Sequence, residues 1–596
     1  MNGTAVKDLM ESVNLAWEDT SYSFSSSGLW LNTNSGPRRL SNYVVIPQEF
    51  VTKDSGKPKK EVYVKVYGCS NIEELPETTL TLEEFDRMTW PSSEWGFSII
   101  TEVQSNVTNH IRRVAQALGN VFAQDTTVYT HMGWRHIGDS WCYLHSGGVI
   151  GDEAAQVELD QNVTCYTLPD HAENYQEAVR ASLRLKDVAP AEISVPLLAL
   201  VYLSPLNEFF RQAGHEPAFV TSLTGPTGTM KSTLAALALC HFGQFTGKSL
   251  LGSFQDTKNA LEVTGFALKD TLMVVDDFFP STQRHESTIM SATLRALLRS
   301  YGDRSGRRRL SSNLKLMEAH IPRGNLLVTG EDVPKLVESD LARLLLLEIN
   351  PGDVDKELLS SLQKDSSLLG QAMRGYIEWL IPQANTLKDM LLEKFEDYRQ
   401  QAQEHGRHSR IPEVIAWLKI GYEMFLDYAV SCDVIPSDSK QIVLDEALEI
   451  LTEIANRQAM VMENDTPVSQ FLSALNEMLA TGQCHCTKLD DDGSFLGSTG
   501  SIKGHGFIGY VDSDYYYLIP GTTMGEVKAF YGRQGINFTI SDRMLYKQLA
   551  SVGAIRESKT GKRVNRTLDK HIDGTVQRLL WVKKEALKKL NGPDET

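Results

Sequence analysis

The run Gly225-Pro226-Thr227-Gly228-Thr229-Met230-Lys231-Ser232-Thr233 constrains the fold of this 596-residue chain more than any other segment. An apolar stretch, 218–223, precedes it, and a helix-forming stretch, 234–239, follows it. This order predicts a strand, a tight loop and the start of a helix. Backbone N–H groups at a helix start bind phosphate, while a lysine and a hydroxyl reach the terminal phosphates and Mg²⁺. We therefore expect all nine residues to bind ATP, and Ser232 also to bind Mg²⁺.

Met230 stands where the phosphate-loop pattern GxxxxGK[ST] has a glycine. Glycine suits that position because it tolerates a positive φ and lets the backbone approach a phosphate closely. Gly225 and Gly228 retain much of that freedom, so the sequence predicts a variant phosphate loop. The alternative is a glycine-rich turn before a core helix.

A second apolar segment, 271–278, ends in Asp276 and Asp277. A phosphate loop needs such an acidic strand to hold Mg²⁺ and to polarise the attacking water. We expect Asp276 to serve the metal and Asp277 to act as the base or to position water. Aspartate at the second place is shorter than glutamate, which predicts slower hydrolysis. The alternative is a buried strand with a capping aspartate pair.

Two more apolar segments complete the predicted sheet. The segment 324–332 places Thr329 or Glu331 against the attacking water, and 339–349 carries Arg343 just before a buried strand. Arg343 either forms an ion pair within its own chain or stabilises the γ-phosphate bound to a neighbouring subunit, which requires an oligomer. The predicted catalytic residues are Lys231, Asp277, Glu331 and Arg343.

Basic clusters stand out because the chain as a whole carries a net charge of −17. Between the second and third apolar segments, residues 302–316 suggest a hairpin that also carries Arg304, and near the end 541–566 suggests a helix, a strand and a basic hairpin, as in winged-helix domains. Each cluster is either a solvated face or a DNA-binding surface. The predicted DNA-binding residues are Arg307, Arg308, Arg309, Lys315, Lys562, Arg563 and Arg566.

Length and composition indicate a globular protein of several domains, with 41% hydrophobic and 23% charged residues. The apolar segment 193–210 contains Pro196, Pro205 and two polar residues, so we expect a buried helix and no membrane span. Seven cysteines, an odd number, favour reduced thiols and a cytoplasmic location. The Cys484-His485-Cys486 cluster lacks further zinc ligands nearby and predicts a short strand.

The order of these segments resembles the domain-of-unknown-function 927 family, AAA+ ATPases of plasmids, phages and mobile elements. Some members look like minichromosome-maintenance replicative helicases. The resemblance covers roughly residues 95–350 and rests on 133–151, 223–239, 257–262, 274–278 and 328–334. It implies ATP-driven movement on DNA by a hexameric ring, with the hairpin around Arg307 lining the pore and Arg343 acting on the neighbouring subunit.

We expect an α/β fold with a P-loop AAA+ core. The predicted domains are a β-rich N-terminal domain (1–160), the ATPase core (161–351), a helical lid or linker (352–465) and a winged-helix-like DNA-binding domain (466–596). The leading hypothesis is an ATP- and Mg²⁺-dependent DNA helicase or translocase that replicates a mobile element. A partner primase or polymerase would supply DNA synthesis. The alternatives are an ATP-regulated DNA-binding initiator or scaffold, and an ATPase switch in defence or signalling.

Overall fold

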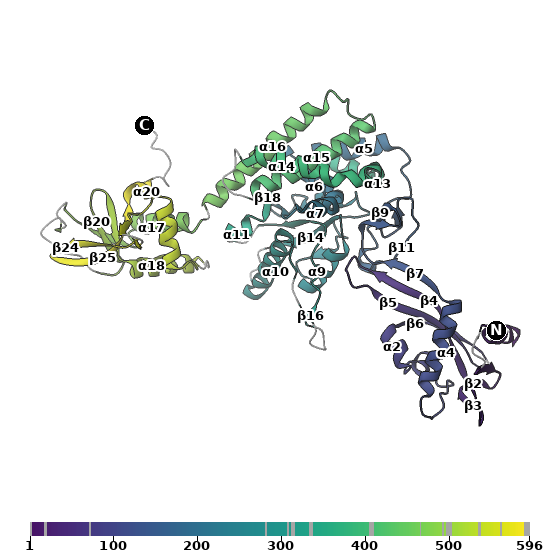
Figure 1. Cartoon of the computed structure of the whole chain (residues 1–596). Coiled ribbons are helices and arrows are strands. Elements are labelled where there is room, and N and C mark those ends of the chain that lie inside the picture. Colours follow the sequence, from purple (N-terminus) through teal and green to yellow (C-terminus); the bar gives the residue numbers. More distant parts are fainter. Residues whose placement is uncertain are drawn as a thin grey trace. The chain divides into compact units, whose positions relative to one another are not determined.

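The computed structural model describes residues 3–16, 21–70, 73–279, 283–306, 309–310, 316–332, 336, 338–403, 410–464, 466–490, 494–495, 504–534, 538–560 and 563–588. The chain folds into two compact units (Figure 1). The first comprises Met1–Asp332, Leu346–Gln400 and Glu413–Leu451. The second comprises Val333–Leu345, Gln401–Pro412 and Thr452–Thr596.

The N-terminal part of the first unit is rich in strands, as predicted. Its largest sheet has the order β11-β7-β4-β5-β6, and a smaller one has the order β1-β2-β3. In β5, Val64 and Val66 are buried while Lys65 between them is half-exposed, the alternation expected of a strand with one face on the core. The strands are β1 (Tyr22–Ser25), β2 (Gly28–Thr33), β3 (Gly36–Ser41), β4 (Tyr43–Asp54), β5 (Glu61–Ser70), β6 (Glu74–Thr81), β7 (Gln124–Tyr129) and β11 (Gln156–Val157). The helices are α1 (Gly3–Leu15), α2 (Leu82–Arg87), α3 (Pro91–Trp95) and α4 (Val107–Phe122).

A three-stranded meander follows, with the order β10-β9-β8. Its strands are β8 (Gly133–Ile137), β9 (Ser140–His145) and β10 (Gly148–Ile150). Ile137 pairs with Ser140, so Gly138 and Asp139 form a two-residue turn. Gly138 has φ +56°, the left-handed conformation that such a turn requires.

The central sheet has the order β13-β14-β17-β12-β18. The pairs β12–β17, β14–β17 and β13–β14 are parallel. Every residue of β12 and β17 is buried, as expected for a parallel sheet covered on both faces. Figure 1 shows α9 and α10 on one side of β14 and α6 and α7 on the other. The strands are β12 (Val220–Thr224), β13 (Gly252–Ser253), β14 (Leu272–Phe278), β17 (Asn325–Gly330) and β18 (Leu344–Glu348).

The helices around this sheet are α5 (Tyr175–Leu183), α6 (Ala191–Leu203), α7 (Asn207–Ala213), α8 (Lys231–Leu239), α9 (Lys258–Ala267) and α10 (Arg284–Gly302). Within the described residues, the segment Ala191–Ala213 is long and apolar enough to cross a membrane, with a mean hydropathy of 1.5. However, 94% of its most apolar 18-residue window is buried, as is typical of a core helix.

The middle of the chain is helical, as predicted. Its helices are α12 (Lys356–Lys364), α13 (Ser366–Leu380), α14 (Ala384–Gln403), α15 (Ile411–Ser431) and α16 (Lys440–Asn464). Tyr202 of α6 stacks on Phe425 of α15 at a centroid distance of 4.1 Å and meets Tyr376 of α13 edge-on. These aromatic contacts pack the helical region against the helices of the central sheet.

The second unit has its own core around a five-stranded sheet, β19-β20-β21-β25-β24. Its helices are α11 (Glu338–Leu341), α17 (Pro467–Ala480), α18 (Pro520–Arg533), α19 (Asp542–Ser551) and α20 (Lys584–Lys588). Its strands are β19 (His485–Lys488), β20 (Phe507–Val511), β21 (Tyr515–Leu518), β22 (Ser558–Thr560), β23 (Arg563–Asn565), β24 (Leu568–Ile572) and β25 (Thr575–Lys583). The Cys-His-Cys cluster thus runs into a short strand. The division into four domains stays a prediction.

Candidate active site

The carboxyl ends of β12, β14 and β17 meet at one edge of the central sheet. Leu223 of β12 pairs with Thr329 of β17, and Val275 of β14 pairs with Val328 of β17. Because the three strands are parallel, the loop after β12 and the polar residues ending β14 and β17 lie together. Three of the four segments that the sequence analysis singled out therefore converge.

The loop after β12, residues 225–233, is the glycine loop. A Cβ at Gly225 would lie 2.0 Å from the carbonyl oxygen of Ile349, so a side chain cannot fit there. Gly228 has open space around it but φ +88°, so the constraint at this position comes from the backbone conformation. The two glycines are thus required for different reasons.

Met230 takes the left-handed conformation, with φ +67° and ψ 20°, immediately before α8 begins at Lys231. A side chain in this region costs about 1–2 kcal/mol. Met230 forms no side-chain capping bond to α8, so the first N–H groups of that helix are left for a ligand or solvent. The chain therefore keeps the backbone path that a glycine would give, at a cost in strain.

Lys231 is buried and lies against its own loop. Its Nζ donates hydrogen bonds to the carbonyl oxygens of Gly225, at 2.6 Å, and Pro226, at 2.9 Å. Burial lowers the pKa of Lys231, and the charges of Glu331, Asp276 and Asp277 oppose that shift. Three carboxylates thus act on one ammonium group. Their excess negative charge would favour a divalent cation, and the ammonium group would favour a phosphate.

Asp276 lies at the centre of a hydroxyl cluster. Ser232 Oγ donates to Asp276 Oδ1 at 2.8 Å, and Thr329 Oγ1 donates to the same oxygen. A hydroxyl beside a carboxylate is a donor set that Mg²⁺ accepts, so the residues fit this metal. Among the described residues, no group of three or more His, Cys, Asp or Glu side chains is arranged to hold a metal. Mg²⁺ here would therefore depend on substrate phosphates as well.

Asp277 sits in a bulge of β14, where the pairing with β17 shifts between Val275 and Phe278. Its φ is +69°, and its backbone N–H donates to Thr329 Oγ1 at 3.2 Å. Burial, followed by the charges of Asp276 and Glu331, raises the pKa of Asp277. A higher pKa makes this carboxylate a stronger base, which suits activation of water.

Glu331 follows β17 and accepts a hydrogen bond from Thr227 Oγ1 of the glycine loop. Thr329, two residues earlier, instead contacts Asp276. Thr329 and Glu331 were predicted as alternatives for one role, whereas in the structure Glu331 contacts the glycine loop and Thr329 contacts the aspartates of β14.

Arg343 lies between α11 and β18, in the second unit, and its Nη1 donates to the carbonyl oxygen of Ser339. The strands β15 (Arg309–Leu310) and β16 (Leu316–Met317) pair antiparallel, as the predicted hairpin requires. Arg307, Arg308 and Lys315 lie outside the described residues, as does the side chain of Arg309.

One hairpin charge is corrected. Arg304, counted among the positive charges of this hairpin, is largely buried at its base. Its guanidinium donates to the carbonyl oxygens of Pro217, at 2.6 Å, and Gly324, at 2.8 Å. Burial lowers the pKa of Arg304. This arginine is therefore bound to the backbone at the hairpin base and is not an exposed charge of the hairpin.

At the C-terminal basic segment, α19 is followed by a hairpin in which Lys559 pairs with Val564. Arg566 Nε lies 3.6 Å from Glu557 Oε2, so part of the positive charge is compensated. Lys562 and the side chain of Arg563 lie outside the described residues.

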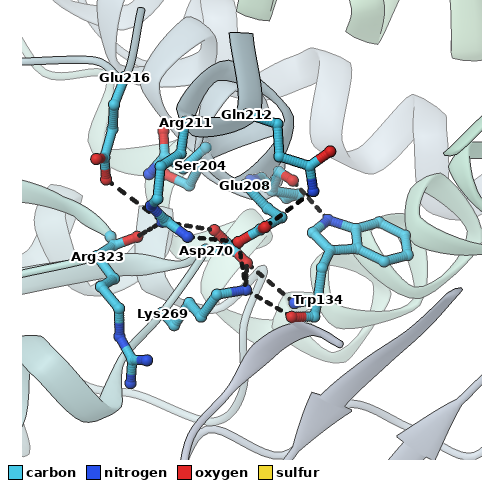
Figure 2. A network of polar contacts seen from close by, with 12 residues as sticks. Trp134, Ser204, Glu208, Arg211, Gln212, Glu216, Lys269, Asp270 and Arg323 are labelled. Carbon is cyan, nitrogen blue, oxygen red and sulfur yellow. Dashed lines mark hydrogen bonds and ion pairs between the residues drawn. The ribbon is translucent and has the colours of Figure 1, made fainter. Parts of the chain in front are cut away.

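A buried ionic network escaped the sequence analysis (Figure 2). Asp270, fully buried just before β14, accepts hydrogen bonds from the Trp134 N–H, at 3.0 Å, and Lys269 Nζ, at 2.5 Å. Arg211 Nη2 lies 3.6 Å from its other oxygen, and Glu208 pairs with Lys269 at 3.0 Å. In the sequence, only the adjacent charges of Lys269 and Asp270 before a strand could have indicated this network. The other members of the network come from distant segments.

A comparison with solved structures gives a fold match over nearly the whole chain. The structure described as "SCCmec type IV Cch - active helicase" has a TM-score of 0.58 and 13% sequence identity, with 96% of this chain and 99% of that chain covered. "The X-ray structure of JCV Helicase" has a TM-score of 0.20 and 15% identity, with 47% and 74% covered. "The A form apo structure of NrS-1 C terminal region-CTR(305-718)" has a TM-score of 0.21 and 10% identity, with 72% and 92% covered.

No family model matches the chain, and no curated protein matches it. The first of these structures shares its fold with this chain at an identity too low to carry over an activity. The predicted family membership therefore stays a prediction.

Proposed function

We propose that this chain is a P-loop AAA+ ATPase that hydrolyses ATP with Mg²⁺ and thereby moves along and unwinds DNA, in the replication of a mobile element. The observation that carries the proposal is the meeting of Lys231, Ser232 and Asp276 at one edge of a parallel sheet. Ser232 Oγ lies 2.8 Å from Asp276 Oδ1. The fold likeness to a helicase structure adds support.

Each residue of the site would have a separate role in ATP binding or hydrolysis. The N–H groups of the glycine loop would bind phosphates, and Lys231 would offset the charge of the terminal one. Ser232 and Asp276 would hold Mg²⁺, whose chemistry is to neutralise charge on the phosphates. Asp277 would take the proton of the attacking water, with Glu331 orienting the loop.

Movement on DNA requires parts beyond this site. In a hexameric ring, Arg343 would act on ATP bound to the neighbouring subunit. The basic hairpin with Arg309, and its neighbours Arg307, Arg308 and Lys315, would contact DNA in the pore. The second unit would add a winged-helix-like surface, because α19 is followed by the β22–β23 hairpin with Lys562, Arg563 and Arg566. A primase or polymerase would be the partner, in the cytoplasm.

Strand displacement on forked DNA, measured together with ATP hydrolysis, tests the proposal. Lys231→Ala should reduce both by at least about 100-fold, because the lysine offsets transition-state charge. Lys248→Ala, an exposed lysine after the same helix, is the matched control and should retain both. Absence of ATP hydrolysis by the unmodified chain would refute the proposal.

Other outcomes would favour the alternatives. Hydrolysis stimulated by DNA without strand separation would favour an initiator or scaffold. Hydrolysis that does not respond to DNA would favour a switch.

A further inference from the structure

A cavity of about 700 Å³ lies in the first unit, at the amino ends of β14 and β17 and therefore at the opposite edge of the sheet from the glycine loop. Its walls come from the turn after β4, from β8, from α7 and from the segment leading into β17. Cavities of this size hold small molecules up to a nucleotide.

Two cations at this cavity lack a carboxylate partner. Within the described part of the chain, no Asp or Glu oxygen lies within 4 Å of the charged nitrogens of Lys57 or Arg323. By contrast, Arg211 and Lys269, which also line it, are paired with Glu208 and Asp270. Figure 2 shows the Arg323 guanidinium directed away from that network.

Lys57 and Arg323 both lie against the ring of Phe266, and Lys57 Nζ also lies 3.1 Å from His320 Nε2. Arg323 Cζ lies 3.7 Å from the ring centroid of Phe266, and Lys57 Nζ lies 4.9 Å from the same centroid. Arg323 Nη1 donates to the Ser55 carbonyl oxygen at 2.9 Å, which fixes the guanidinium beside the turn. Two like charges on one ring, Arg323 buried and Lys57 half-buried, favour an anion beside them.

His131 supplies an unused acceptor at the same place. It is fully buried, and its Nδ1 lies 2.7 Å from the Met132 carbonyl oxygen, so Nδ1 carries the proton and Nε2 is an acceptor. Nε2 has no hydrogen-bond partner in the described structure. Burial, followed by the charge of Arg323, lowers the pKa of His131 well below its usual value, which keeps the ring neutral.

Gly56 lies beside two of these groups, Arg323 and His131. A Cβ on Gly56 would lie 2.4 Å from Arg323 Nη1 and 3.4 Å from His131 Nε2. The two nitrogens therefore lie within about 6 Å of each other, near enough for one phosphate group to accept from the guanidinium and donate to the imidazole.

We propose that Lys57, Arg323 and His131 form a second anion site, which binds a phosphate group that carries or adjoins an O–H donor. The two cations contact phosphate oxygens, and His131 Nε2 accepts from the hydroxyl. Inorganic phosphate and a nucleotide with its ribose hydroxyls both offer this chemistry. Sulfate has no O–H group, and a DNA phosphodiester has none at the phosphate.

Calorimetric titration at pH 8 and constant ionic strength tests the site with inorganic phosphate, sulfate, AMP and a short single-stranded DNA. Three proteins are compared: the unmodified chain, Lys57→Gln and Lys59→Gln, the last being an exposed lysine on the same turn outside the cavity. Lys57→Gln should weaken phosphate binding at least about tenfold, and Lys59→Gln should not. Any binding at the glycine loop is the same in all three proteins, so it does not contribute to the difference in affinity between them.

Sulfate should bind at least about tenfold more weakly than phosphate, because it leaves His131 unpaired. AMP binding tighter than phosphate, with the same dependence on Lys57, would identify a nucleotide as the occupant, and equal affinity would identify free phosphate. Equal phosphate binding by all three proteins would overturn the site. Equal affinities for sulfate and phosphate would show that the ligand needs no O–H donor and would overturn the proposal. The same holds if Lys57→Gln weakens the binding of DNA and of no other ligand.

Discussion

Two aspartates in the left-handed conformation bracket β14, and they differ in almost every other respect. Asp270, with φ +54°, lies before the strand, is fully buried and is surrounded by cations. Asp277, with φ +69°, lies in the bulge near the other end, is exposed and faces two carboxylates. An aspartate in the left-handed conformation therefore stabilises the fold through buried ion pairs at one end of β14. At the other end it places a carboxylate at the candidate active site.

Asp270→Asn should have the largest effect, on stability. Asparagine keeps the shape and tolerates the left-handed conformation, but it leaves Lys269 and Arg211 with one fewer buried counter-charge. Breaking a buried ion pair costs about 3–5 kcal/mol. Urea denaturation measures the loss in free energy of unfolding, and a change below about 1 kcal/mol would contradict the role given to Asp270.

Asp277→Asn is the matched substitution at the exposed end. It should reduce ATP hydrolysis by about 100-fold or more, because an amide cannot accept the proton of the attacking water. Stability should change by no more than about 0.5 kcal/mol, as for most surface positions. Retained hydrolysis would show that another group is the base.

Met230→Gly should stabilise the chain by about 0.5–1 kcal/mol. The substitution removes about 1–2 kcal/mol of strain from the left-handed conformation. Part of this gain is lost, because glycine loses more conformational entropy on folding than methionine does. Met230→Ala is the control, because it keeps a Cβ and with it the strain. Equal free energies of unfolding for the two variants would show that Met230 is not strained.

Glu331→Gln should have the smallest effect, on the pH dependence of hydrolysis. The charge of Glu331 helps to raise the pKa of Asp277, so its removal lowers that pKa. The base works deprotonated, and activity should therefore persist to a lower pH, with the acid limb displaced by less than about one pH unit. Glu357→Gln, on the exposed face of α12, should leave the profile unchanged.

The sequence predicted four of the five strands of the central sheet, because β12, β14, β17 and β18 are continuous apolar runs next to polar residues, and it missed the two-residue β13. It could not predict which polar residues would touch. Thr329 meets Asp276 because β17 lies directly beside β14, a consequence of strand order that no local pattern encodes.

Long-range packing explains what was wrong or missed. The residues around Arg304 have the composition of an exposed basic hairpin. Nevertheless, Arg304 is largely buried and donates hydrogen bonds to the carbonyl oxygens of residues 217 and 324. Trp134 and Asp270 are far apart in sequence, and their contact depends on how the meander packs on the sheet. Such partners are set by tertiary structure and leave no periodic signal.

The left-handed Met230 also bears on how loops of this kind are recognised. A search keyed to glycine before the lysine would pass over this chain, although its backbone follows the path that glycine would allow. What the loop demands at this position is a dihedral angle, and residue identity is only a statistical proxy for it. Gly225, where the Ile349 carbonyl oxygen excludes any side chain, is the more dependable marker.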